Sequence, residues 1–95
     1  MGRKSLAAKL LEETPEDEED AAGSWLVVYD FRGLKPNPRF WKNLNRLVAL
    51  LGDGSMIQYS VFKTRNKRGA HVAVKIAKHY GAEVKAFRGE EVELS

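Results

Sequence analysis

The chain has 95 residues, no cysteine and 43% hydrophobic residues, a size that allows one small folded domain and excludes a two-domain enzyme. The absence of cysteine excludes a disulfide framework, a thiolate zinc site and a cysteine nucleophile, and it fits a reducing compartment. The longest uncharged apolar runs, residues 25–29 and 47–51, are far shorter than the ~20 residues that a membrane-spanning helix needs. We therefore expect a soluble, cytoplasmic protein.

The net charge of +3 conceals two segments of opposite sign. Residues 1–24 hold three basic and seven acidic residues, whereas residues 25–95 hold 13 basic and six acidic ones. Residues 31–88 contain all 13 of these lysines and arginines but only two acidic residues, Asp53 and Glu83. Charged residues that serve only solubility usually include both signs. This excess of positive charge therefore indicates a polyanion, namely a nucleic acid, as the partner.

Residues 1–24 predict a disordered, acidic N-terminal tail. The leucines among the first 11 residues could form one or two amphipathic turns, but Pro15 interrupts the pattern. The like charges of residues 16–20 then repel one another. The folded domain is therefore expected to occupy residues 25–95.

The first half of this domain predicts a strand followed by a helix. Residues 25–29 form an apolar run rich in β-forming residues. Asn37 then suits a helix N-cap, Pro38 suits the first helical position, and Gly52 suits the end of the helix. Apolar residues recur at helical spacing in between: Phe40, Trp41, Leu44, Leu47, Val48 and Leu51.

The second half repeats this pattern. Residues 56–62 are rich in β-formers and become a hairpin if they bend near Tyr59 and Ser60, and a second helix is expected over residues 67–80. Residues 83–87 alternate in polarity and predict the next strand. The resulting order is the βαββαβ of a ferredoxin-like α+β sandwich.

Residues 91–94 alternate as well and predict one extra C-terminal strand. A domain of this size buries only about 60% of its chain surface, so it gains stability by dimerising. We therefore expect a homodimer in which the extra strand pairs with the sheet of the partner.

Lysines and arginines supply the candidate nucleic-acid contacts. Those on the two predicted helices have no glutamate three or four residues away, so local ion pairs are not available and phosphates are the natural counterions. Such contacts fix position without reading the base sequence. The candidates are Arg32, Arg39, Lys42, Arg46, Lys63, Arg65, Lys67, Arg68, Lys75 and Lys78.

Aromatic residues offer a second kind of nucleic-acid contact. Tyr59, Phe40 and Trp41 have ring faces on which bases could stack. The helical spacing of Phe40 and Trp41 favours a place in the core for these two.

Asp30, directly after the first strand, has two interpretations. Its carboxylate suits the cap of a turn. A metal-assisted attack on a phosphodiester needs oxygen ligands for Mg²⁺, and one carboxylate rarely suffices. The residue types alone favour the cap, although a two-fold dimer could place two Asp30 side chains opposite each other around one ion.

Two segments together resemble the Cas-two family, the smaller core protein of CRISPR adaptation. The family places an Asp at the end of its first strand and a Gln-x-Ser-Val-Phe element after its first helix. The matching segments here are Val27-Val28-Tyr29-Asp30-Phe31 and Gln58-Tyr59-Ser60-Val61-Phe62. The resemblance covers residues 25–88 and implies a ferredoxin-like homodimer.

The resemblance implies a scaffold of CRISPR spacer acquisition, a part of antiviral defence, that bridges Cas-one integrase subunits and contacts the duplex backbone. Alternatively it implies a magnesium-dependent hydrolase, an endoribonuclease or endodeoxyribonuclease, with Asp30 as the catalytic and metal-binding residue. Tyr29, Ser60 and Phe62 match the flanking motif positions. Lys63 departs from the family, which commonly has an acidic residue there. A third hypothesis is a ribonuclease outside CRISPR, similar to the virulence-associated protein D toxins.

Overall fold

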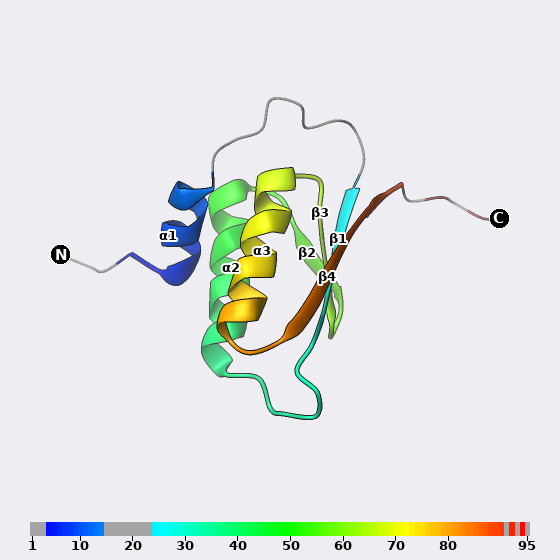
Figure 1. Cartoon of the computed structure of the whole chain (residues 1–95). Coiled ribbons are helices and arrows are strands. Elements are labelled where there is room, and N and C mark those ends of the chain that lie inside the picture. The colour runs from blue at the N-terminus through cyan, green and yellow to red at the C-terminus, as the bar shows by residue number, and fades with distance from the viewer. Residues whose placement is uncertain (1–3, 15–23, 91, 93, 95) are drawn as a thin grey trace.

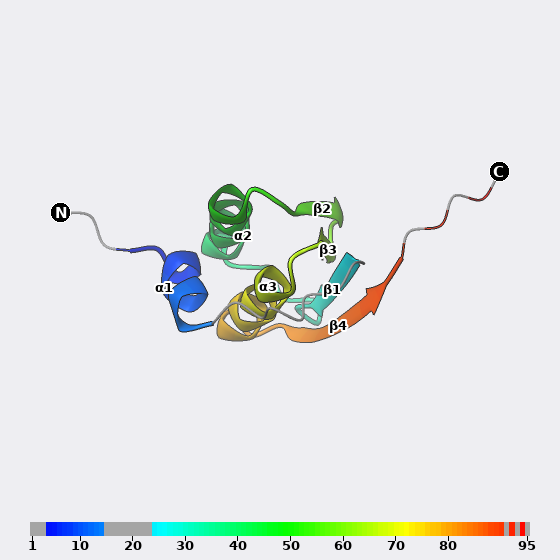
Figure 2. The same ribbon diagram turned by 90° about the horizontal axis from the view of Figure 1, so that it is seen from above.

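The computed structural model describes residues 4–14, 24–90, 92 and 94, which form three helices and four strands. The elements are α1 (Leu6–Glu13), β1 (Ser24–Asp30), α2 (Pro38–Leu51), β2 (Ser55–Gln58), β3 (Val61–Thr64), α3 (Lys67–His79) and β4 (Glu83–Gly89). Helices α2 and α3 cover one face of the sheet, and α1 packs on both of them on the side away from the sheet (Figures 1 and 2). None of the helices in this described part combines the length and apolar character that crossing a membrane requires.

The sheet has the strand order β2-β3-β1-β4, and every neighbouring pair is antiparallel. From β1 onward the elements follow the predicted βαββαβ order, an α+β arrangement compatible with a small ferredoxin-like fold. The predicted bend at Tyr59 and Ser60 is confirmed, because β2 ends at Gln58 and β3 begins at Val61. Central strand β1 pairs Val27 with Phe62 of β3, and both side chains are buried under the helices.

The signals for the ends of α2 are confirmed. The side chain of Asn37 accepts a hydrogen bond from the Arg39 N–H at 2.9 Å, and Pro38 begins the helix. Gly52 ends it with a φ of 70°, a left-handed conformation that glycine adopts without a Cβ penalty. The apolar face of α2 buries Phe40, Leu44 and Leu47, which form the centre of the core.

Residues 6–13 correct the prediction of a disordered tail over residues 1–24. They form α1, whose N-cap Ser5 accepts a hydrogen bond from the Ala8 N–H. Ala7 is fully buried, and its N–H donates to the side chain of Asn43 on α2 at 2.9 Å. The helix forms because α2 and α3 bury its apolar side, and Pro15 lies beyond its end. Residues 1–3 and 15–23 lie outside the described residues.

The C-terminal segment leaves the predicted extra strand untested. Strand β4 continues to Gly89, two residues further than predicted. Val92 and Leu94 are exposed and belong to no strand of this single chain, while residues 91 and 93 lie outside the described residues. Pairing of this segment with a partner stays a prediction.

Candidate nucleic-acid interface

Three cations on the outer face of α2, Arg39, Lys42 and Arg46, are all exposed; we call them the α2 stripe. They face outward because the opposite side of the helix is buried in the core. The first and last members are seven residues apart, which corresponds to about 10 Å along the helix axis. Among the described residues, none of the three takes part in an ion pair. Within the described part of the chain, the stripe therefore offers three positive charges along one line without a carboxylate partner.

Two of the predicted contact residues on α3 instead hold α1 in place. The guanidinium of Arg68 donates to the backbone carbonyls of Thr14, at 2.6 Å, and Leu11. The Lys75 ammonium donates to the Thr14 hydroxyl at 2.7 Å. Carbonyls in the last turn of a helix lack partners within the helix, and cations there interact favourably with the helix dipole. Arg68 and Lys75 therefore have a structural role that the expected disorder of residues 1–24 concealed. Lys78, the remaining candidate on α3, is exposed.

Two cations after the hairpin, Lys63 and Arg65, border a cavity at the C-terminal end of α2 that is also lined by Ala49 and Gly52. Lys63 is half-buried in β3 and pairs in register with Leu26, so it lies on the sheet face opposite the helices. Lys67 is half-buried at the start of α3, and Arg65 is exposed in the preceding turn. The candidate cations are thus spread over the α2 stripe, the turn before α3 and the other face of the sheet.

Asp53 organises that turn. Its carboxylate accepts hydrogen bonds from the Thr64 hydroxyl at 2.7 Å and from the Arg65 backbone N–H at 2.6 Å. Burial alone would raise the pKa of Asp53, but these hydrogen bonds and the charge of Arg65 lower it below its ordinary value of 3.8. This carboxylate therefore has an architectural use and does not neutralise the α2 stripe.

Asp30 caps the turn after β1, as the residue types indicated. Its Oδ1 accepts a hydrogen bond from the Arg32 N–H at 2.8 Å, and Arg32 has a left-handed φ of 54°. Glu83 stands opposite Asp30 in the β1–β4 register and forms an exposed ion pair with Arg32, which raises the pKa of Arg32. A phosphate that contacts Arg32 would thus have to compete with the Glu83 carboxylate for its guanidinium.

The donor set for a magnesium ion near Asp30 is incomplete within one chain. Asp30 and Glu83 bring two carboxylates to adjacent strands, but Arg32 already binds one of them. Nowhere in the described part of the chain do three or more histidine or acidic side chains gather as metal ligands would. Mg²⁺ often takes one or two carboxylates and completes its shell with water and phosphate oxygens. The fit is therefore partial, and magnesium binding stays a prediction.

The three positions that flank the family motif differ in their surroundings. Tyr29 and Phe62 are 2% and 1% exposed and belong to the core. Ser60 is exposed in the β2–β3 turn, and its carbonyl accepts a hydrogen bond from the Tyr29 N–H at 3.0 Å. In this structure the motif positions define the contact between β1 and the hairpin.

An aromatic cluster lies at the same end of the sheet. The ring of Tyr29 makes edge contacts with Phe31, Phe40 and Trp41, and Tyr59 lies against Trp41 with 5.1 Å between ring centroids. The Tyr29 hydroxyl is buried, and no described residue forms a hydrogen bond with it. Burial, and secondarily Tyr59, raises the pKa of Tyr29 to about 12.

A cavity of about 340 Å³ opens beside this cluster, between the β1–α2 loop and the tip of the hairpin. We call it the aromatic pocket. Its lining includes Tyr29, Asp30, Leu34, Lys35, Tyr59 and Ser60. Sequence reasoning noticed the ring of Tyr59 but missed Lys35, because nothing in the local pattern of the loop indicated that it borders a cavity.

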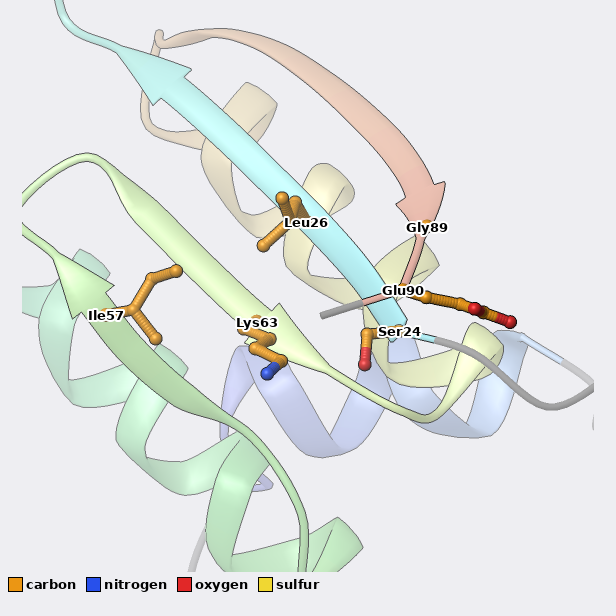
Figure 3. A pocket seen from close by; sticks show the side chains of 6 residues that line it. All are labelled: Ser24, Leu26, Ile57, Lys63, Gly89 and Glu90. Carbon is orange, nitrogen blue, oxygen red and sulfur yellow. The ribbon is translucent and has the colours of Figure 1, made fainter. Parts of the chain in front are cut away.

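The sheet face away from the helices carries an apolar group of side chains together with the charged residues Asp30, Lys63, Lys85 and Glu83. Val28, Ile57 and Phe87 are 37%, 52% and 53% exposed, and the half-buried Leu26 and Val61 project on the same side by strand alternation. We call these five residues the open sheet face. A second cavity, of about 260 Å³, lies on this face. Figure 3 shows three of its lining residues, Leu26, Ile57 and Lys63, projecting from the sheet with the helices behind.

Comparisons with family models, with curated proteins and with solved structures find no match for this chain. The likeness to the Cas-two family therefore depends on the two motifs quoted above, and the CRISPR role that it implies stays a prediction.

Proposed function

We propose that this protein binds nucleic acid through the phosphate backbone and acts as a homodimeric scaffold. The α2 stripe carries the proposal. Its three cations are exposed and form no ion pair within the described residues, at a spacing of one helical face. Phosphates satisfy such charges and release counterions, which favours binding at low salt. The resemblance to the Cas-two family supports CRISPR spacer acquisition as the setting, with a Cas-one integrase as a partner.

The open sheet face supports the dimer. The exposed face of a two-layer antiparallel sheet is ordinarily polar, but here Leu26, Val28 and Phe87 are apolar neighbours across β1 and β4. The same face also carries Lys85, opposite Val28, and Glu83, which is paired with Arg32. Two copies joined in this way would keep both α2 stripes on the outside, where two further partners could bind.

The backbone contact is tested by fluorescence anisotropy with a blunt DNA duplex and an RNA duplex over a range of salt concentrations. The triple variant Arg39→Gln, Lys42→Gln and Arg46→Gln should bind the duplexes at least tenfold more weakly. The slope of log K against log[salt] should also become shallower, by up to ~0.9 for each phosphate that the variant no longer binds. Lys9→Gln, an equal loss of charge on the exposed side of α1, is the matched control for Lys42→Gln. A triple variant with unchanged affinity and slope would overturn the proposal.

The dimer is tested by light scattering. Phe87→Glu on the open sheet face, or deletion of residues 90–95, should shift the protein towards the monomer. Leu50→Glu is the control, because Leu50 is exposed on α2, away from the sheet. A dimer that survives both changes would place the interface elsewhere.

A magnesium-dependent nuclease is the second candidate, favoured by the position of Asp30. By strand alternation Asp30 lies on the same side as the open sheet face, so a two-fold partner could bring a second carboxylate towards it. Incubation of labelled RNA and DNA with Mg²⁺ and with chelator separates cutting from binding. If the protein is a nuclease, Asp30→Asn should remove cleavage and keep binding. Nucleic acid that stays intact in the presence of Mg²⁺ would contradict the nuclease and leave the scaffold as the remaining proposal.

A further inference from the structure

The aromatic pocket combines three features of a ligand site. Its volume of about 340 Å³ lies in the range of small-molecule sites. Tyr59 borders it with a side chain that is 72% exposed and that lies against Trp41. Tyr29 also lines the cavity, and its hydroxyl is buried with no hydrogen-bond partner among the described residues. Buried polar groups are nearly always satisfied, so an unpaired hydroxyl on a residue that lines a cavity indicates a missing partner.

The charges around the pocket favour a neutral aromatic ligand with a phosphate attached outside. Asp30 borders the cavity and repels anions from its interior. Lys35, also on the border, is exposed and can meet a phosphate at the rim. An unpaired base of a nucleic-acid strand has this combination of a flat neutral ring and a flanking phosphate. Aromatic side chains and phenol hydroxyls recognise such bases by stacking and by hydrogen bonds to the base edge.

We infer that the aromatic pocket binds one unpaired nucleobase, stacked on Tyr59 and hydrogen-bonded by the Tyr29 hydroxyl. The inference rests on the proposed nucleic-acid function and adds that the preferred substrate carries an unpaired nucleotide, as at the end of a duplex. Because the Tyr29 hydroxyl both donates and accepts, and because stacking tolerates every base, the pocket distinguishes a base from no base and does not read sequence.

The test compares three labelled duplexes by anisotropy: a blunt end, a one-nucleotide overhang, and the same overhang with an abasic nucleotide that keeps the phosphate. The full chain should bind the base-bearing overhang about tenfold more tightly than the abasic one. Tyr59→Ala should remove this difference, and Tyr59→Phe, which keeps the ring, should retain it. Equal affinity for the two overhangs, or a difference that survives Tyr59→Ala, would overturn the inference.

The role of the buried hydroxyl is tested by Tyr29→Phe, which should reduce the preference for the base several-fold. The matched control is Tyr80→Phe, which removes a hydroxyl that contacts Asn43 and does not border the pocket. The preference should be unchanged in the control. An unchanged preference in Tyr29→Phe would exclude the hydrogen bond.

Failure of the pocket is distinguishable from failure of the proposed function. Blunt duplexes that bind with a strong salt dependence, without any gain from the overhang, would leave the function standing and remove the pocket. If no duplex binds, the proposed nucleic-acid function is wrong. Base binding by the aromatic pocket is then tested separately, by titrating the protein with adenosine and following its NMR spectrum. Shifts confined to Tyr29, Tyr59 and Ser60 would support it, and an unchanged spectrum would overturn it.

Discussion

At the residue scale, the hydroxyl of Tyr29 stands out among the described side chains as a buried polar group without a hydrogen-bond partner. It is buried among the rings of Phe31, Phe40 and Trp41, and no atom of the described residues accepts or donates a hydrogen bond to it. An unsatisfied buried polar group costs roughly 1–3 kcal/mol. Such a group in a folded protein calls for an explanation, such as a functional role or an ordered water.

Tyr29→Phe should therefore raise the free energy of unfolding, by about 1 kcal/mol, because it removes the unsatisfied hydroxyl and keeps the ring contacts. Urea denaturation measures this change. Tyr80→Phe should have the opposite sign, since Asn43 donates to the Tyr80 hydroxyl at 3.2 Å. A destabilised Tyr29→Phe variant would mean that the hydroxyl has a partner in solution.

Asp53 predicts how stability depends on acid. Hydrogen bonds lower the pKa of Asp53 in the folded protein below its ordinary value of 3.8. Asp53 therefore contributes fully to the free energy of unfolding above pH 3.8, and this contribution is lost as the pH falls through the folded pKa. Asp53→Asn should lower the free energy of unfolding by about 1 kcal/mol at pH 7, and the difference should narrow below about pH 4. Urea titrations at pH 7 and pH 3 measure both values. Glu90→Gln, at an exposed site, should show no such dependence.

At the element scale, α1 shows how one arginine can hold a helix. The helix has only eight residues, too few to be stable alone in water, so its contacts with α2 and α3 must maintain it. Ala7 fills the apolar seam, Asn43 satisfies one N–H at the beginning, and Arg68 satisfies two carbonyls at the end. The stability of α1 is therefore a property of its docking site.

Arg68→Met, which keeps an apolar stem but removes the donors, should release α1 and leave the sheet folded. Hydrogen exchange should become faster at the amides of residues 9–13, by an amount equivalent to about 1–3 kcal/mol. Arg65→Met is the control, because its side chain is exposed in the turn before α3. If exchange accelerates equally throughout β1 and α1, the helix and the sheet unfold as one unit and the docking argument is wrong.

At the scale of the whole molecule, the docking of α1 fixes the chain just before the acidic segment of residues 16–20. Thr14 is held beside Arg68 and Lys75, and the chain returns to the sheet at Ser24. The five acidic residues at positions 16–20 are therefore tethered at both ends to a body of opposite charge. Tethering through so few residues gives an effective concentration on the order of mM. At that concentration the segment can compete with phosphate for the basic surface.

Neutralising positions 16–20 in the full chain, with Glu→Gln and Asp→Asn, should tighten duplex binding at low salt. The gain should shrink as salt increases, because the Debye length falls from ~30 Å at 0.01 M to ~8 Å at 0.15 M. Swapping Glu and Asp within the segment preserves its charge and should change nothing. Anisotropy titrations at several salt concentrations compare the three proteins, and equal affinities at all of them would exclude self-competition.

The sequence by itself determined the elements from β1 to β4, because their signals are local. Asn37 and Pro38 start α2, Gly52 ends it, and the hairpin bends at Tyr59 and Ser60, each through the conformational preference of one or two residues. The outward direction of the α2 stripe followed from helical spacing in the same way.

Only the tertiary structure decided where α1 lies, what Arg68 and Lys75 bind, and which groups border the aromatic pocket. These contacts join residues more than 50 positions apart, such as Thr14 with Arg68, or loops whose mutual approach depends on the sheet. A disordered acidic tail was predicted for residues 1–24 because their charges and Pro15 were weighed without the surface that buries Ala7. Burial and hydrogen bonding depend on what surrounds a side chain, and for these residues the surroundings come from distant parts of the chain.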